Sequence, residues 1–368
     1  MHAIGVSAVN ALTAHKEWAG RPPDERFDSV RALYEAAHNR RLRTEEHRVE
    51  TRELALQAGP DERLALRSGC AEPAALTHWS FEQLATIAGA PPKYLRTLPA
   101  TIAAAAINHG LQRQPRLQHQ LFADRVAPWT VRAMTSPRYA RVHHDELASR
   151  MLDLTSTHPA WHLPLGYKDG VFGAERVPTG AYLGDRDMFL FLVDGNRDIN
   201  DPTDASHSGL FRGLILRNSD VGAAALTLDV FLFRAVCGNH IIWGFQHVAS
   251  FRRRHIGASI QDAWSDSLHG VRAALDADTD ADTAVIAKAA TSEIAASREQ
   301  VIQSVTQRLD LPQKHAAEAY DIAEATETNP RSVWGYVQGL TRLSQRTPWQ
   351  DGRFVLDRAA GSLLATVQ

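Results

Sequence analysis

The sequence predicts an α+β fold, with helices first, a central and mostly antiparallel β-sheet crossed by a packed helix, and a helical C-terminal part. The sheet is predicted from residues 226–232, where aliphatic residues alternate with Thr227, Asp229 and Phe231. A period of two is typical of a strand with one inward face. The preceding segment Asn218–Gly222 (NSDVG) has the residue types that favour a chain reversal. Beyond residue 260, apolar residues recur at helical spacing in segments rich in Ala, Gln and Glu.

The N-terminal third is expected to be a mixed leader followed by short helices. Residues 1–75 are weakly periodic and predict a helix or short strands. From Thr77 the spacing predicts a helix with Ser80 as its N-cap, which ends before residues 91–92 (PP). Two further helices are expected over 92–95 and 101–111, broken at Pro99.

The middle of the chain, residues 76–255, is expected to form one α+β core domain. We expect two strands within 124–141 and a helix from His143 onward, with Leu147, Met151, Leu152 and Leu154 as its apolar stripe. A β meander is expected over 161–194, then a polar loop over 194–208, and then the hairpin around the NSDVG turn.

Residues 256–368 are expected to form a helical region of acidic character. Residues 261–368 hold ten basic and fifteen acidic side chains. The segment 276–282 (DADTDAD) predicts a solvated linker or loop, and Ser332 predicts the start of a helix that extends through Leu343.

Composition excludes several classes of protein. Forty basic and forty-two acidic residues give a net charge of -2, which argues against a protein that coats duplex DNA by bulk positive charge. The two cysteines have neither the density of a disulfide scaffold nor the spacing of a zinc site. No leader-like start and no apolar run of about 20 residues is present, so a cytoplasmic protein with no membrane contact is expected.

Three constellations suggest chemistry but favour simpler interpretations. Residues 143–146 (HHDE) have metal-ligand types, but adjacent histidines on a helix point about 100° apart, so a solvated helix start is predicted. Residues 194–200 resemble the start of a calcium loop, but the sixth position is Ile199 and the twelfth is Ala205, so a polar loop is predicted. Cys237, three residues before His240, is expected to be a small core residue rather than a nucleophile. With no phosphate-loop or hydrolase motif, no cofactor, metal or enzymatic activity is expected.

The arginines suggest a nucleic-acid surface. Thirty-five of the forty basic residues are Arg, and in the β-rich part several stand next to an aromatic residue. Such pairs suit a surface that binds phosphates and stacks bases, although a GC-rich genome also raises the Arg content and Phe on a strand is usually core. The densest basic cluster is Arg252–Arg254. The candidate nucleic-acid-binding residues are Arg132, Arg138, Tyr139, Arg212, Arg217, Arg234, Arg252, Arg253 and Arg254.

Two motifs resemble a known family. The run 216–222 (LRNSDVG), an alternating apolar strand and the run 233–239 (FRAVCGN) are similar to the phage/plasmid-like proteins grouped as domain of unknown function 932, as is the upstream segment 131–139. The resemblance covers residues 75 to 255 and departs from the family at Gly238 and Asn239, which carry the usual pair in reversed order. The family supplies no agreed activity, only a tendency to occur on mobile elements.

Together these observations lead to two main hypotheses. The first is a nucleic-acid-binding accessory protein of a phage, plasmid or other mobile element. By analogy of fold with phage annealing proteins, it would bind or anneal single-stranded DNA and assemble as a homo-oligomer. The second is a protein-interaction module, such as a host-defence antagonist. A hydrolase or transferase built on Cys237 or the acidic loop is the least favoured hypothesis. A continuous Arg-lined groove would support the first hypothesis, and Arg paired with carboxylates the second.

Overall fold

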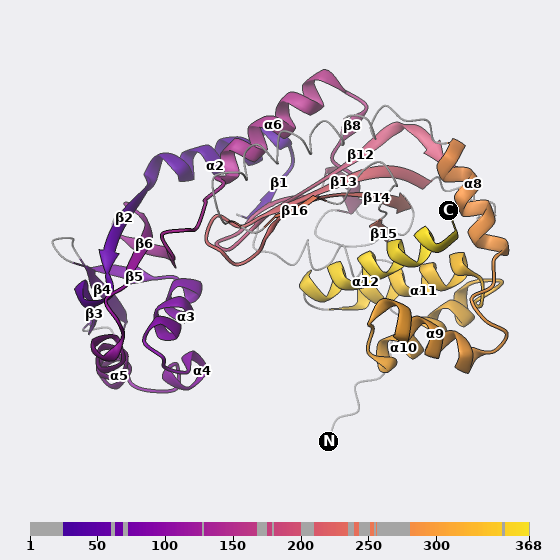
Figure 1. Ribbon diagram of the computed structural model, residues 1–368. Coiled ribbons are helices and arrows are strands. Elements are labelled where there is room, and N and C mark those ends of the chain that lie inside the picture. Colours follow the sequence, from indigo (N-terminus) through magenta and orange to yellow (C-terminus); the bar gives the residue numbers. More distant parts are fainter. Residues whose placement is uncertain are drawn as a thin grey trace.

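The chain forms two β-sheets and a C-terminal group of helices, which Figure 1 shows arranged in a row. The computed structural model describes residues 25–59, 63–68, 73–126, 129–167, 175–178, 180–199, 210–234, 239–242, 251–253, 255, 280–347 and 350–367. The mixed α+β class predicted from the sequence is confirmed. In this part of the chain no helix has both the length and the apolar character needed to cross a membrane.

The first sheet has the strand order β2-β6-β7-β5-β4-β3. Its strands are β2 (Thr44–Glu50), β3 (Leu54–Ala58), β4 (Leu64–Ser68), β5 (Ala74–Leu76), β6 (Gln118–Asp124) and β7 (Thr130–Thr135). All neighbours are antiparallel except β5 and β7. Because β2 pairs with β6 along its full length, the boundary expected at residue 75 falls inside this sheet. Where two strands were expected within 124–141, the structure has only β7, and β6 lies earlier.

Three helices cover the first sheet: α3 (His78–Ile87), α4 (Pro92–Leu95) and α5 (Ala100–Arg113). The break at Pro99 is confirmed. The N-cap of α3 is Thr77 rather than Ser80, and Thr77 Oγ1 accepts the Ser80 N–H at 3.1 Å. Ser80 is instead buried and donates to the Val131 carbonyl of β7 at 2.7 Å, which joins the helix to the sheet.

The second sheet is antiparallel throughout, as predicted, with the order β1-β11-β12-β13-β14-β15. Strand β16 also pairs with β14, and β8 with β12. The strands are β1 (Arg26–Phe27), β8 (Trp161–His162), β11 (Ala181–Leu183), β12 (Met188–Ile199), β13 (Leu210–Asn218), β14 (Leu226–Arg234), β15 (Asn239–Ile242) and β16 (Phe251–Arg253). A separate pair joins β9 (Leu165–Tyr167) to β10 (Arg176–Pro178). Strand β12 runs to Ile199 through an irregularity after Val193, so the polar loop expected from Asp194 begins later.

Two helices, not one, lie across the same face of the second sheet: α2 (Val30–Arg43) and α6 (His144–Thr157) (Figure 1). The predicted stripe of α6 is confirmed for Leu147, Met151 and Leu154, which are buried in this core, while Leu152 packs at its margin. A helix or short strands were expected within residues 1–75, but the bounds of α2 and its position on the second sheet were not predicted.

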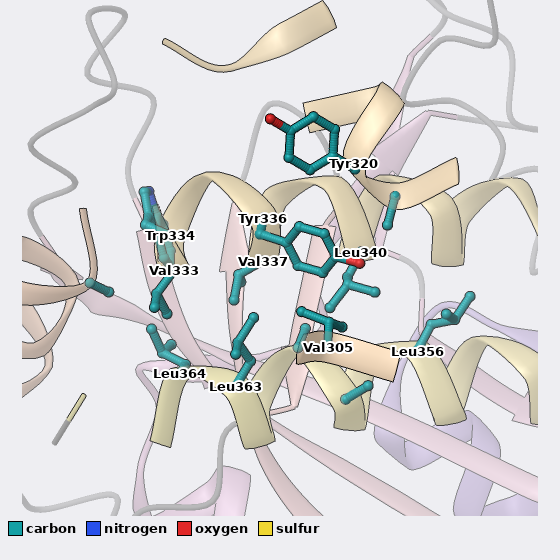
Figure 2. Packing of buried hydrophobic residues seen from close by; sticks show 14 of the residues in the cluster. Val305, Tyr320, Val333, Trp334, Tyr336, Val337, Leu340, Leu356, Leu363 and Leu364 are labelled. Carbon is teal, nitrogen blue, oxygen red and sulfur yellow. The ribbon is translucent and has the colours of Figure 1, made fainter. Parts of the chain in front are cut away.

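The helical C-terminal part is confirmed. It contains α8 (Asp280–Thr291), α9 (Arg298–Leu309), α10 (Gln313–Thr326), α11 (Val333–Arg346) and α12 (Gln350–Leu364). Ser332 caps α11 as predicted, and Figure 2 shows Trp334, Tyr336 and Leu340 of that helix in the core between the helices. Ile199 and Leu210 of the sheet belong to this core, so the helices and the sheet fold against each other.

Candidate functional site around the Asn218–Gly222 turn

The turn between β13 and β14 binds to residues from several distant segments. Its five residues are Asn218–Gly222, and Gly222 has a φ of +85°, as expected for the end of a tight reversal. Asn218 Nδ2 donates to the Val142 carbonyl at 2.9 Å, and Ser219 Oγ donates to the Arg186 carbonyl at 2.5 Å. Tyr139 Oη donates to the Ser219 carbonyl at 2.7 Å. The Val221 carbonyl accepts two hydrogen bonds from α3, from Trp79 Nε1 at 2.9 Å and from Gln83 Nε2 at 3.1 Å. The turn therefore fastens the second sheet to the first sheet and its helices.

The carboxylate of Asp220 lies at the centre of this junction and is buried. Arg132 of β7 donates to both of its oxygens, with Nη1–Oδ2 and Nη2–Oδ1 distances of 3.1 and 3.2 Å. Arg141 donates to the Asp220 carbonyl. A bidentate guanidinium–carboxylate pair is among the strongest and most directional of side-chain contacts, so it fixes the relative position of β7 and the turn.

The surroundings of Asp220 keep it ionised despite burial. Burial opposes its ionisation, but the interactions with His144, which is protonated only in acid, and with the charged Arg132 hold the pKa of Asp220 well below its usual range. Arg40 of α2 lies in the same environment, and burial together with the charge of Arg132 lowers the pKa of its guanidinium. Arg40 Nη1 donates to the Gly184 carbonyl at 2.6 Å, so a third element is tied to the junction.

The helix start predicted for residues 143–146 is confirmed, and Glu146 is exposed, but the prediction that this start is solvated is wrong for His143 and His144, which are buried. His144 Nε2 accepts the Asp220 N–H at 3.2 Å, which requires a ring that is unprotonated at that nitrogen. Burial lowers the pKa of each histidine to about 4, and the charge of Arg132 adds to the effect at His144. Both are therefore neutral near pH 7. Among the described residues no group of His, Cys, Asp and Glu has the geometry of a metal site.

A second contact brings two basic segments together. The His255 ring stacks on Tyr139 with a centroid distance of 5.0 Å, and the Ala140 N–H donates to His255 O at 3.0 Å. His255 directly follows Arg252–Arg254, and Arg138 directly precedes Tyr139. Strand β16 pairs with β14 so that Arg252 is opposite Thr227, which is in turn opposite Arg217 of β13. The backbone of Arg252 and Arg253 thus lies near the segment of Arg138, and we call Arg138, Tyr139, Arg252 and Arg253 the basic junction.

A surface hollow of about 300 Å³ lies on another side of the turn. It is lined by Thr77, His78 and Trp79 at the start of α3, by Glu25, and by Gly184, Asp185, Arg186 and Asp187 of the β11–β12 connection. The Arg186 guanidinium lies over the Trp79 ring, 5.6 Å from its centroid. The hollow therefore combines an aromatic face, a cation and carboxylates.

Comparison with known families identifies the central part of the chain. Residues 180–348 match the model of a family described as a domain of unknown function (DUF932). Residues 180–348, a little under half of the chain, are therefore similar to DUF932 proteins. The resemblance read from the NSDVG turn is confirmed, but its extent is corrected, because the match begins after the segment 131–139 and continues through α11. No curated protein and no solved structure matches the chain.

The folded chain places two of the predicted nucleic-acid-binding arginines in the interior. Arg132 is buried against Asp220, and Arg212 of β13 is buried against Asp282 of α8, with Nε–Oδ2 and Nη2–Oδ2 distances of 3.1 and 2.5 Å. A guanidinium that is buried and paired with a carboxylate has no face left for a phosphate, so these two residues hold the fold together. Asp282 is correspondingly buried within α8 instead of lying in the solvated linker predicted for it.

The other predicted residues of the site have different environments. Arg138 is exposed, Tyr139 is half-buried, and the half-buried Arg217 lies over the Phe189 ring at 5.1 Å. The backbone positions of Arg234 in β14 and of Arg252 and Arg253 in β16 are described. Arg254 and Cys237 lie outside the described residues.

Sequence reasoning missed the residues that hold the junction. Asp220 was interpreted as turn chemistry, His144 as a solvated helix start, and Arg40 and Arg141 were not considered. The sequence contains one indication of this junction, which is Asp220 in the turn between β13 and β14. A carboxylate in a turn between two buried strands needs a nearby cation.

Proposed function

We propose that the protein binds single-stranded nucleic acid through the basic junction. The supporting observation is the contact of His255 with Tyr139 and Ala140, which brings the backbone segment of Arg252 and Arg253 near the segment of Arg138. Within the described residues Arg138 makes no side-chain ion pair and is exposed, so its guanidinium is available to a phosphate oxygen.

Tyr139 acts in this proposal as an anchor. One ring contact is made by His255, another by the Arg141 guanidinium at 5.1 Å, and its hydroxyl donates to Ser219. Burial raises the pKa of the Tyr139 phenol, so it stays neutral. Because Tyr139 is engaged in this way, phosphate binding falls to the arginines, whose positions it fixes.

The distribution of charge along the chain is consistent with this position. Residues 25–150 hold eighteen basic and fourteen acidic side chains, whereas residues 280–367 hold nine basic and eleven acidic ones. Arg138 and Tyr139 of the basic junction belong to the more basic of these two ranges. A local excess of positive charge attracts a polyanion even when the net charge of the chain is near zero.

Two further properties extend the proposal. By fold-level analogy, the protein anneals complementary strands as a homo-oligomer, in the cytoplasm, as an accessory protein of a phage, plasmid or other mobile element. Size-exclusion chromatography with light scattering, with and without oligonucleotide, tests the assembly. A strand-annealing assay with complementary labelled oligonucleotides tests the activity.

A protein-interaction module is the second candidate. It is favoured by the burial of Arg132 and Arg212 against carboxylates and by a hollow of about 520 Å³ between α9 and α10, lined by polar residues such as Gln303, Thr306 and Gln313. Absence of nucleic-acid binding at low salt would favour this candidate.

The direct test compares two single substitutions of equal charge change. Arg138→Ala removes a cation from the basic junction, and Arg308→Ala removes an exposed cation from α9. Fluorescence anisotropy with a labelled single strand should show weaker binding for Arg138→Ala alone. Equal affinities of both variants would place any binding site elsewhere.

A further inference from the structure

The connection between β11 and β12 is held rigidly from its inner side. The four carbonyls of Gly184–Asp187 all accept hydrogen bonds. The Gly184 carbonyl accepts from Arg40, and the Asp185 carbonyl accepts from Arg132 at 3.3 Å. The Arg186 carbonyl accepts from Ser219 Oγ at 2.5 Å, and the Asp187 carbonyl accepts from the Gly184 N–H at 2.9 Å. The side chains of Asp185 and Arg186 are exposed and line the hollow. The buried network around Asp220 thus orients this segment as a preorganised binding surface.

The opposite wall of the hollow is an immobilised aromatic ring. Trp79 is half-buried and its Nε1 donates to Val221 O at 2.9 Å, so the indole has one orientation. The exposed Arg186 guanidinium lies over that ring, 5.6 Å from its centroid, so a base can stack on the indole once this exposed side chain swings aside. Aromatic rings and guanidinium planes are the two surfaces on which unpaired bases stack in proteins.

The lining of the hollow favours an uncharged base over a phosphate. Three acidic residues, Glu25, Asp185 and Asp187, line it together with one cation, Arg186. Asp185 makes no side-chain ion pair or hydrogen bond within the described residues, so both of its oxygens can accept. Guanine presents two adjacent N–H donors on its Watson–Crick edge, whereas adenine and cytosine place an acceptor nitrogen beside their amino group and thymine has a single N–H between two carbonyls. A carboxylate therefore pairs best with guanine.

We propose that the hollow between Trp79 and Asp185 binds a guanine base, stacked on Trp79 in place of the Arg186 side chain and paired with the Asp185 carboxylate. The inference rests on the proposed function, because the base belongs to the bound single strand. Ser219 joins the two sites: it accepts from Tyr139 of the basic junction and donates to Arg186 of the hollow. When a single strand binds at the basic junction, one of its bases would enter the hollow and be recognised there.

The test uses a short oligothymidylate and the same strand with one central guanine. Wild-type protein should bind the guanine strand about tenfold more tightly. Asp185→Asn should remove that preference while keeping the affinity for oligothymidylate, and the fold should be unaffected because only the Asp185 main chain is bonded within the protein. Asp153→Asn, at an exposed site on α6, is the matched control and should keep the preference. Trp79→Leu should also remove the preference, with circular dichroism confirming that it is folded.

The outcomes separate the two proposals. Equal binding of both strands by wild type, or a preference that survives Asp185→Asn, would overturn the guanine site and leave the basic junction standing. Guanosine monophosphate is a third probe. If wild type binds it, Asp185→Asn does not, and neither protein binds either strand, the guanine site is supported and the proposed function is contradicted. No binding of any of the three probes would overturn both.

Discussion

Gly222 ends the turn with a φ of +85°, a conformation that costs an L-residue about 1–2 kcal/mol. A Cβ at this position would have room, because the nearest atom is Tyr139 Cε2 at 3.5 Å. Gly222→Ala should therefore lower the free energy of unfolding by about 1–2 kcal/mol through backbone strain, and Gly222→Asn by less, because Asn tolerates positive φ. Urea denaturation measures both. An Ala variant as stable as wild type would show that the turn does not keep this conformation in solution.

Arg132 is the partner that keeps Asp220 from being a lone buried charge. Arg132→Met should lower the free energy of unfolding by about 3–5 kcal/mol, because it leaves the carboxylate buried without its two-pronged partner. The matched control is Arg331→Met, whose pair with Glu293 is 3.1 Å long and has side chains that are 40% and 44% exposed. That variant should be destabilised far less, because water replaces an exposed partner. Similar destabilisation of both variants would contradict the structural role given to Asp220.

Two ion pairs hold the C-terminal helices to the second sheet: the buried pair of Arg212 with Asp282 of α8, and the pair of the buried Asp229 with the half-buried Arg358 of α12 at 3.3 Å. Burial raises the pKa of Asp282, an effect that the charge of Arg212 opposes. Asp282→Ala would leave Arg212 buried without this carboxylate, so α8 should separate from β13 more easily. Amide hydrogen exchange should accelerate in α8 while α2 and α6 keep their protection. Uniform acceleration throughout the chain would mean that the pair supports global rather than local stability.

The elements predicted well are those whose signal is local. Alternation revealed β13 and β14, and Ser332 and Pro99 marked helix starts, because these patterns act within a few residues. Strand β2 was not predicted, because its sequence TEEHRVE is the polar pattern of an edge strand and its partner β6 lies far along the chain. Helix α2 could not be located within residues 1–75 for a similar reason. Its buried residues Val30, Leu33 and Ala37 pack against the second sheet, which is formed by distant segments of the chain.

The candidate site was predicted as a set of residues but not as an arrangement. Arg138, Tyr139 and Arg252–Arg254 were identified from composition and their aromatic neighbours, yet their meeting depends on His255 docking on Ala140, 115 residues away. His144 and Asp220 are separated by 76 residues, so nothing near either one indicates that it is buried. Arg132 and Arg212 have the same local signal as a surface arginine, and only the folded chain shows their carboxylate partners.

The whole molecule should become less stable on mild acidification. His143 and His144 have a pKa of about 4 in the folded protein, against an ordinary value of 6.5 for an exposed histidine. Since the unfolded chain binds more protons in this range, their contribution is fully present above pH 6.5 and disappears as the pH falls toward 4, on the order of 3 kcal/mol for each histidine. Chemical denaturation across this range measures the slope. His144→Gln should flatten it, and the matched control is His109→Gln, at an exposed site on α5. A wild-type stability that is constant from pH 7 to 5 would contradict the burial of these rings.

The proposed function depends most on nucleic-acid binding by the basic junction. A salt titration of single-strand binding tests this proposal most directly. Removing one arginine that binds a phosphate should reduce the log-log slope of affinity against salt by about 0.7. Replacing Arg252, Arg253 and Arg254 together by Ala should weaken binding and flatten the slope by as much as about 2, with circular dichroism showing that both proteins are folded. Binding by wild type with a slope that the triple substitution leaves unchanged would contradict the basic junction as the site, and no binding by wild type at low salt would contradict nucleic-acid binding itself.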